Sequence, residues 1–139
     1  MNSIKKVLLL AAITTLNISA IGTSRSEWQE EGVTEITSLA ELNTFLKTHK
    51  KAVVEFYNRT CPVCQHFKQA RIFPTLAGNM QSVGFAKVSV QEGGKLHKLY
   101  SINSYPTFLF FKDGRVIEEY SGFTSLAPFE KKINGIFSR

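Results

Sequence analysis

Cysteine is scarce in this 139-residue chain, which has only Cys61 and Cys64, separated by two residues. A structural zinc site generally needs four ligands, and no second Cys or His pair lies nearby, although His66 would supply a third ligand. Covalent haem attachment requires a histidine directly after the second cysteine, where this chain has Gln65. We therefore expect no bound metal and no cofactor.

Low-complexity segments, internal repeats and clusters of basic residues are also absent. The 17 Lys and Arg residues exceed the 11 Asp and Glu residues, for a net charge of +6, but they are scattered along the chain. A scattered excess is typical of a solvated surface, so no nucleic-acid partner is expected. The hydrophobic content of 43%, including 11 phenylalanines, suits the core of one domain.

The apolar run near the N-terminus is short for a membrane-spanning helix and is interrupted by threonine and asparagine. Two lysines precede it and small residues follow it, a layout typical of a secretory signal peptide. We predict a signal peptide over residues 1–22, with cleavage after Ala20 or Gly22, and export to the periplasm. The alternative is an uncleaved segment that anchors the protein in a membrane.

Export affects the interpretation of the cysteine pair, because disulfides persist in oxidising compartments. A disulfide that closes a loop of two residues adds little stability, since its entropic effect grows with loop length. The pair therefore indicates chemistry rather than structural stabilisation.

Periodicity and turn signals predict one domain over residues 33–139, after a polar lead-in over residues 23–32 whose Trp28 is expected to cover an apolar patch. The predicted strands cover residues 33–36, 52–57, 83–90, 107–111 and 116–120, and Asp113-Gly114 forms the turn between the last two. The predicted helices cover residues 39–48, with a Ser38–Glu41 capping box, and 95–100, after a break at Gly93-Gly94, and a last helix follows Ser125. A further helix begins at Pro62, and Pro74 ends or kinks it near Phe73, with further turns over 75–81.

Helices separate the early strands, which favours parallel pairing, whereas the last two strands form an antiparallel hairpin. The fold class is therefore α/β, with a mixed central β-sheet and helices on both faces. Glu55 stands out in the apolar strand 52–57. Either strand alternation turns it toward solvent, or it is a buried carboxyl below the cysteines.

This order, with Cys-x-x-Cys after the second strand, resembles the thioredoxin fold over roughly residues 33–137. The segments that carry the resemblance are Val54-Glu55-Phe56-Tyr57, Ser104-Tyr105-Pro106-Thr107, and Phe110 to Arg115 followed by Gly122. Cytosolic thioredoxins have Trp-Cys-Gly-Pro-Cys, whereas proline directly after the first cysteine is similar to exported Dsb-type oxidoreductases and glutaredoxins. The chain is too short to contain the large helical insertion of the exported oxidases. At the position five residues after the second cysteine, where the family commonly has proline, this chain has Gln69.

The resemblance implies that Cys61, at a helix N-cap whose dipole favours a thiolate, is the nucleophile. Cys64 is the resolving cysteine, and the two form a disulfide when oxidised. Glu55 would relay a proton to or from Cys64, and Lys87 would tune Glu55. The alternative for Glu55 and Lys87 is a plain buried ion pair.

The resemblance also implies a substrate-binding surface around Cys61, with a cis peptide bond before Pro106; an ordinary trans proline is the alternative. The expected surface residues are Thr60, Pro62, Val63, Tyr105, Pro106 and Gly122.

The function that follows from the resemblance is exported thiol–disulfide exchange with protein substrates, in the reductase direction. The expected partners are protein thiols and disulfides and an upstream redox partner, such as a membrane electron donor, and the protein is expected to be a monomer. The alternatives are a disulfide-forming oxidase or isomerase, and a metal- or haem-handling thiol protein of the cytochrome c maturation type.

Overall fold

The computed structural model describes residues 27–139, which form five β-strands and five α-helices. In chain order these are β1 (Val33–Glu35), α1 (Leu39–Thr48), β2 (Lys51–Tyr57), α2 (Pro62–Gln69), α3 (Ile72–Asn79), β3 (Gly84–Ser89), α4 (Val90–Leu99), β4 (Thr107–Lys112), β5 (Arg115–Ser121) and α5 (Leu126–Phe137). The predicted signal peptide and the first part of the predicted lead-in lie outside the described residues and stay predictions. Between residues 27 and 139, no helix has both the length and the apolar character to cross a membrane.

The strands form one mixed sheet in the order β1-β3-β2-β4-β5. β3 pairs in parallel with β1 and with β2, whereas β4 is antiparallel to both β2 and β5. The predicted α/β class and the thioredoxin fold are confirmed. β2 lies at the centre of the sheet, so the strand that leads to Cys61 is paired on both edges.

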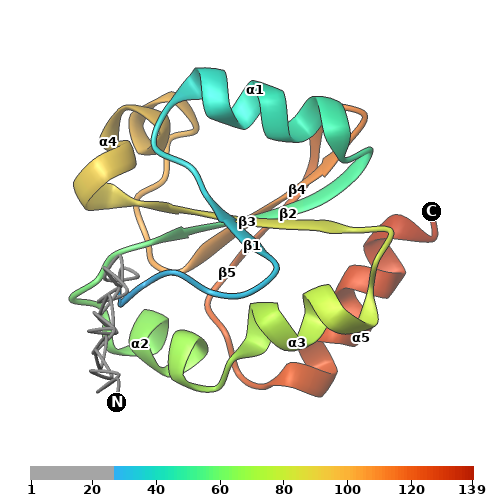
Figure 1. Ribbon diagram of the computed structural model, residues 1–139. Coiled ribbons are helices and arrows are strands. Elements are labelled where there is room, and N and C mark those ends of the chain that lie inside the picture. The colour runs from blue at the N-terminus through green and yellow to red at the C-terminus, as the bar shows by residue number, and fades with distance from the viewer. Residues whose placement is uncertain (1–26) are drawn as a thin grey trace, which may run out of the picture.

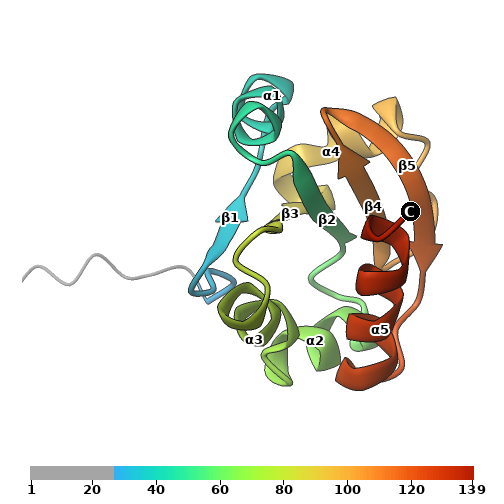
Figure 2. The same cartoon turned by 90° about the vertical axis from the view of Figure 1, so that its right-hand side faces the viewer.

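Helices cover both faces of the sheet (Figures 1 and 2), with α1 and α4 on one face and α2, α3 and α5 on the other. Alternate residues of β2 serve the two sides: Val54 packs into the core under α1 and α4, and Val53 into the core under α3 and α5. Glu55 is two residues from Val53 and therefore points to the face that α2 covers.

The helix α4 starts at Val90, five residues earlier than predicted. Ser89 caps it by accepting a hydrogen bond from the backbone N–H of Glu92 (3.1 Å). Gly93 lies inside the helix with non-helical dihedral angles and is buried, and a Cβ there would collide with the side chain of Val88. Gly93 therefore permits close packing of α4 on β3, and the predicted break is confirmed as a kink between two helical segments.

The predicted long helix after Cys61 is interrupted at Arg71, which takes a left-handed conformation (φ 51°) between α2 and α3. Pro74 causes the interruption at this place, because its ring clashes with the carbonyl four residues earlier in a continuous helix, that of Ala70. The break thus precedes the proline by one turn and does not fall at Phe73.

The predicted hairpin joins β4 to β5. Asp113 and Gly114 both have positive φ (50° and 77°), as a two-residue turn compatible with strand twist requires. The capping box before α1 is modified: Ser38 accepts from the N–H of Glu41 (3.3 Å), but Glu41 accepts from the N–H of Thr37 (2.7 Å). Both local predictions place the turn and the helix start correctly.

Candidate active site

The segment between β2 and α2 places Cys61 at the N-cap of α2. Asn58 folds the chain back, since its side-chain oxygen accepts from the N–H of Thr60 (3.0 Å) and its backbone oxygen from the N–H of Cys61 (3.0 Å). Pro62 then occupies the first helical turn, where its missing N–H leaves no hydrogen bond unmade. Cys61 makes no cap hydrogen bond with its side chain, so its sulfur is directed elsewhere.

The sulfur of Cys61 faces the loop before β4 and donates to the backbone oxygen of Tyr105 (3.5 Å). The peptide bond between Tyr105 and Pro106 is cis, in agreement with the expected conformation. The backbone oxygen of Pro106 accepts from the N–H of Gly122 (2.9 Å), so the end of β5 joins the same site. Segments 44 and more residues apart in sequence thus meet at one thiol.

Cys64 lies one turn inside α2 and is 0% exposed, whereas Cys61 is partly exposed. Both are free thiols in this structure, so their disulfide stays a prediction. Burial raises the pKa of the Cys64 thiol, and the neighbouring Cys61 and Glu55 raise it further. Cys64 therefore keeps its proton until a base removes it.

Glu55 is buried, with 3% of its surface exposed, so the solvent-facing alternative is wrong. Burial raises the pKa of its carboxyl well above the ordinary value. Lys87 opposes the increase, while Glu30, Glu35 and Cys61 add to it. A carboxyl with a raised pKa keeps its proton to a higher pH than an ordinary surface glutamate does.

Lys87 lies opposite Glu55 in the β2–β3 register, as the predicted relay requires. Its ammonium, however, is 2.7 Å from a carboxylate oxygen of Glu30 and 3.8 Å from one of Glu35. Among residues 27–139 no ion pair joins it to Glu55, so the predicted plain ion pair of Glu55 with Lys87 is not formed.

Sequence reasoning missed Glu30 and Glu35 as neighbours of the site. Glu35 aligns with Lys87 in the β1–β3 pair, and a charged residue ending an edge strand is a weak signal for this position. Glu30 belongs to the polar lead-in, 57 residues before Lys87, and no local pattern reports such a contact.

The predicted substrate surface surrounds Cys61. Thr60, Pro62 and Val63 are exposed next to it, and Val63 keeps 40% of its surface accessible. The structure brings these residues together with Tyr105, Pro106 and Gly122, and substrate binding by this surface stays a prediction. Phe123, which the prediction omitted, lies beside them, with its ring 6.4 Å from that of exposed His66.

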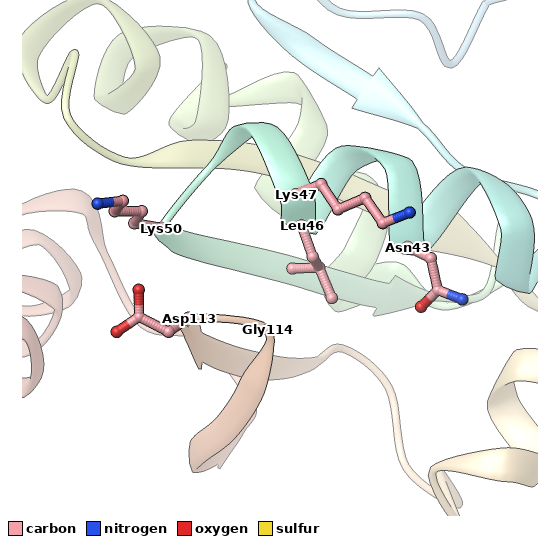
Figure 3. A pocket seen from close by; sticks show the side chains of 6 residues that line it. All are labelled: Asn43, Leu46, Lys47, Lys50, Asp113 and Gly114. Carbon is pink, nitrogen blue, oxygen red and sulfur yellow. The ribbon is translucent and has the colours of Figure 1, made fainter.

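Hollows elsewhere on the domain are unrelated to the thiols. One of about 450 Å³ lies between the end of α1 and the β4–β5 turn (Figure 3), lined by Asn43, Leu46, Lys47, Lys50, Asp113 and Gly114. This hollow adjoins the start of β2, whereas Cys61 follows the end of β2. The two ends of a strand of this length are about 20 Å apart. In the described part of the chain, no three His, Cys, Asp or Glu residues are grouped to hold a metal ion.

Known proteins resemble this chain in sequence and in fold. A family model described as Thioredoxin matches residues 33–135. A thioredoxin of Mycoplasmoides gallisepticum is 38% identical over 88 residues, which are 63% of this chain and 86% of that protein. Protein disulfide isomerase-like 1-4 of Oryza sativa subsp. japonica is 35% identical over 89 residues, 63% of this chain and 16% of that protein. The solved structure of mitochondrial thioredoxin 3 of Saccharomyces cerevisiae, in its oxidized form, has a TM-score of 0.66 and 28% identity, and the match covers 74% of this chain and 94% of that one.

Proposed function

This chain belongs to the thioredoxin family and is a thiol–disulfide oxidoreductase, and we propose that it is an exported reductase of protein disulfides. The observation that carries the proposal is the arrangement of its thiols. A partly exposed Cys61 stands at a helix N-terminus, and a buried Cys64 lies one turn further on, with the buried carboxyl of Glu55 close to both.

The reaction begins when Cys61, in its thiolate form, attacks one sulfur of a substrate disulfide. A bond forms between Cys61 and that sulfur, the substrate S–S bond breaks, and the second substrate sulfur leaves as a thiolate that takes up a proton. The product is a mixed disulfide.

Cys64 then resolves the mixed disulfide. Its thiol gives its proton to the Glu55 carboxylate, and the resulting thiolate attacks the Cys61 sulfur. The Cys61–Cys64 disulfide forms, and the remaining substrate sulfur leaves as a thiolate and is protonated. Two electrons have passed from the dithiol to the substrate, and an upstream dithiol must restore the pair.

Protein substrates suit the surface around Cys61. Val63 and Phe123 offer apolar contacts, and the backbone of Tyr105 lies within reach of an extended peptide that approaches the sulfur. A backbone-mediated contact of this kind is tolerant of substrate sequence.

The reductase direction is supported by the acid next to Cys64 and by the short connections between successive elements from β1 to α5, which leave no room for an inserted helical domain. Export, with a membrane electron donor as the upstream partner, is supported by the N-terminal sequence pattern. The compact domain is proposed to act as a monomer.

Trapping tests the exchange reaction. Cys64→Ser is expected to accumulate mixed disulfides with cellular proteins, because the resolving step is blocked, whereas Cys61→Ser captures none. Absence of captured partners with both variants contradicts the proposal.

The direction of disulfide exchange and the cellular location of the protein are tested by separate experiments. Equilibration of the Cys61–Cys64 pair against glutathione is expected to give a potential near the reducing end of the family range, about −270 mV, and a value near −120 mV would assign an oxidase. Sequencing the N-terminus of the protein from a periplasmic fraction is expected to show cleavage after Ala20 or Gly22. Recovery of the uncut chain in the membrane fraction supports the anchored alternative.

A further inference from the structure

Residues 27–31, which we call the strap, cross from the cysteine helix to the sheet before the chain enters β1 (Figure 1). The ring of Trp28 stacks on Tyr57 at the end of β2, with ring centres 5.0 Å apart. Lys68 of α2 places its ammonium 4.8 Å from the Trp28 ring centre and 3.9 Å from a Glu27 carboxylate oxygen. The strap is therefore packed against the elements that hold the two thiols and the acid near them.

Beneath the strap, one buried lysine is shared among three carboxyl groups. Glu35, Lys87 and Glu55 form a row across β1, β3 and β2, because Lys87 aligns with one acid on each side. Lys87 is 1% exposed and bridges to the strap, where its ammonium donates to the backbone oxygen of Trp28 and to Glu30 at 2.7 Å. The side chain of Glu30 is 7% exposed, and its other oxygen, Oε1, has no hydrogen-bond partner among the described residues.

We propose that Glu30 is a positioning residue that binds Lys87 and withholds its charge from Glu55, so that the strap determines how much of Glu55 carries a proton. The proposal rests on the proposed function, since the proton on Glu55 matters for exchange only if Cys64 gives its proton to that acid. Glu30 itself touches neither thiol nor substrate, and it acts through the lysine.

The direction of the effect follows from the charges that face Glu55. These are Lys87 on β3, Glu30 on the strap, Glu35 on β1, and the thiols of Cys61 and Cys64 on α2. Neutralising Glu30 removes one negative charge and also frees the ammonium to approach Glu55. Both changes favour the ionised form of Glu55.

The test is a titration of Glu55 in the full chain, followed by ¹³C NMR of its carboxyl carbon, in the wild type and in Glu30→Gln. We expect the midpoint of Glu55 to fall by about one pH unit or more, which is a tenfold change in its proton affinity. Glu31→Gln, which removes an exposed charge from the same strap, is the matched control and is expected to leave the midpoint in place. An unchanged midpoint in Glu30→Gln overturns the proposal.

Two variants that lack Lys87 separate the effect that Glu30 has through Lys87 from the direct effect of the Glu30 charge on Glu55. In a Lys87→Met background, Glu30→Gln is expected to move the Glu55 midpoint by much less than in the wild type. An equal shift in both backgrounds means that Glu30 acts by its charge alone and overturns the proposed withholding of Lys87. Glu30→Met, which keeps the side-chain volume, replaces Glu30→Gln if the amide variant does not fold.

Kinetics link the titration to exchange. Reaction of the reduced protein with dithiobis(nitrobenzoate) releases two coloured thiolates, the second when Cys64 resolves the mixed disulfide. The pH midpoint of this second phase is expected to move down in Glu30→Gln together with the NMR midpoint, and a second phase that does not move overturns the link to exchange. A wild type with no second phase contradicts the proposed function itself, while the NMR titration reads the Glu30–Lys87–Glu55 coupling independently.

Discussion

Cys64 lies one turn of α2 beyond Cys61, but only Cys61 is in contact with solvent. The Cys61 thiol is accessible to a disulfide from outside, whereas the buried Cys64 thiol lies next to Cys61 and the buried Glu55. The accessibility of the two sulfurs thus determines that Cys61 reacts with the substrate first and Cys64 second.

Alkylation should therefore distinguish the two thiols. At pH 8, iodoacetamide is expected to modify Cys61 at least about tenfold faster than Cys64, because the Cys64 thiol is buried and its pKa is raised. Tandem mass spectrometry of the tryptic peptide 60–68 locates the label. Cys64→Ser should react like the wild type and Cys61→Ser much more slowly; equal labelling of both sulfurs would refute the assigned order.

Stability should depend on pH through Glu55. Because burial raises the pKa of this carboxyl in the folded state, its contribution is fully present below the unfolded value of about 4.5 and is lost as the pH rises through the folded value. Glu55→Gln is therefore expected to be as stable as the wild type near pH 4 and more stable at pH 8, by several degrees in Tm. Urea or thermal unfolding measures the difference, with exposed Glu119→Gln as the control. A Glu55→Gln variant less stable at pH 8 than at pH 4, relative to the wild type, would contradict it.

His97 should have the opposite pH dependence. Its Nε2–H donates to the backbone oxygen of Val88 (3.0 Å), and Nδ1 is buried without a partner among residues 27–139. Burial lowers the pKa of the imidazole, so stability is full above pH 6.5 and is lost as the pH falls through the folded value. His97→Gln is expected to lose less stability than the wild type between pH 7 and 5 in urea unfolding. Exposed His66→Gln should behave like the wild type, and identical pH curves for all three proteins would disprove the prediction.

Two serines at helix N-caps allow a matched test of capping. Ser38 accepts a hydrogen bond from the first turn of α1, whereas Ser125 makes no such bond at α5. Ser38→Ala is expected to lower the free energy of unfolding by about 1 kcal/mol, and Ser125→Ala by clearly less. Chemical denaturation of both variants measures this, and equal losses would mean that the cap hydrogen bond contributes little.

The turn at Asp113-Gly114 and the Ser38 cap were predictable because the residues that specify them are neighbours in the sequence. Gly93-Gly94 was predictable only in part. The backbone freedom of a glycine pair predicts the kink, but Gly93 is also needed because Val88 leaves no space for a side chain. Only the packing of α4 on β3 reveals that requirement.

Some residues of the candidate site were likewise predictable from the sequence, and others were not. The positions of Cys61, Cys64 and Pro106 followed from motif and order of elements, and Trp28 does cover an apolar surface, the ring of Tyr57. The partner of Lys87 was not predictable, because the choice among three carboxyl groups depends on the path of the strap. Charge pattern along one strand carries no information about a segment 57 residues away.

The three-residue strand β1 has a consequence for folding. Within residues 27–139 it pairs only with β3, while β4 and β5 are joined by a two-residue turn. Closing the long loop from β1 to β3 carries a larger entropic penalty than closing the hairpin, so the N-terminal strand is expected to dock late and detach first. Amide hydrogen exchange of Ile36, whose N–H donates to the backbone oxygen of Lys87 (2.9 Å), would then report a partly opened form. In that form β2, β3 and β4 stay paired, while Lys87 is no longer covered by the strap.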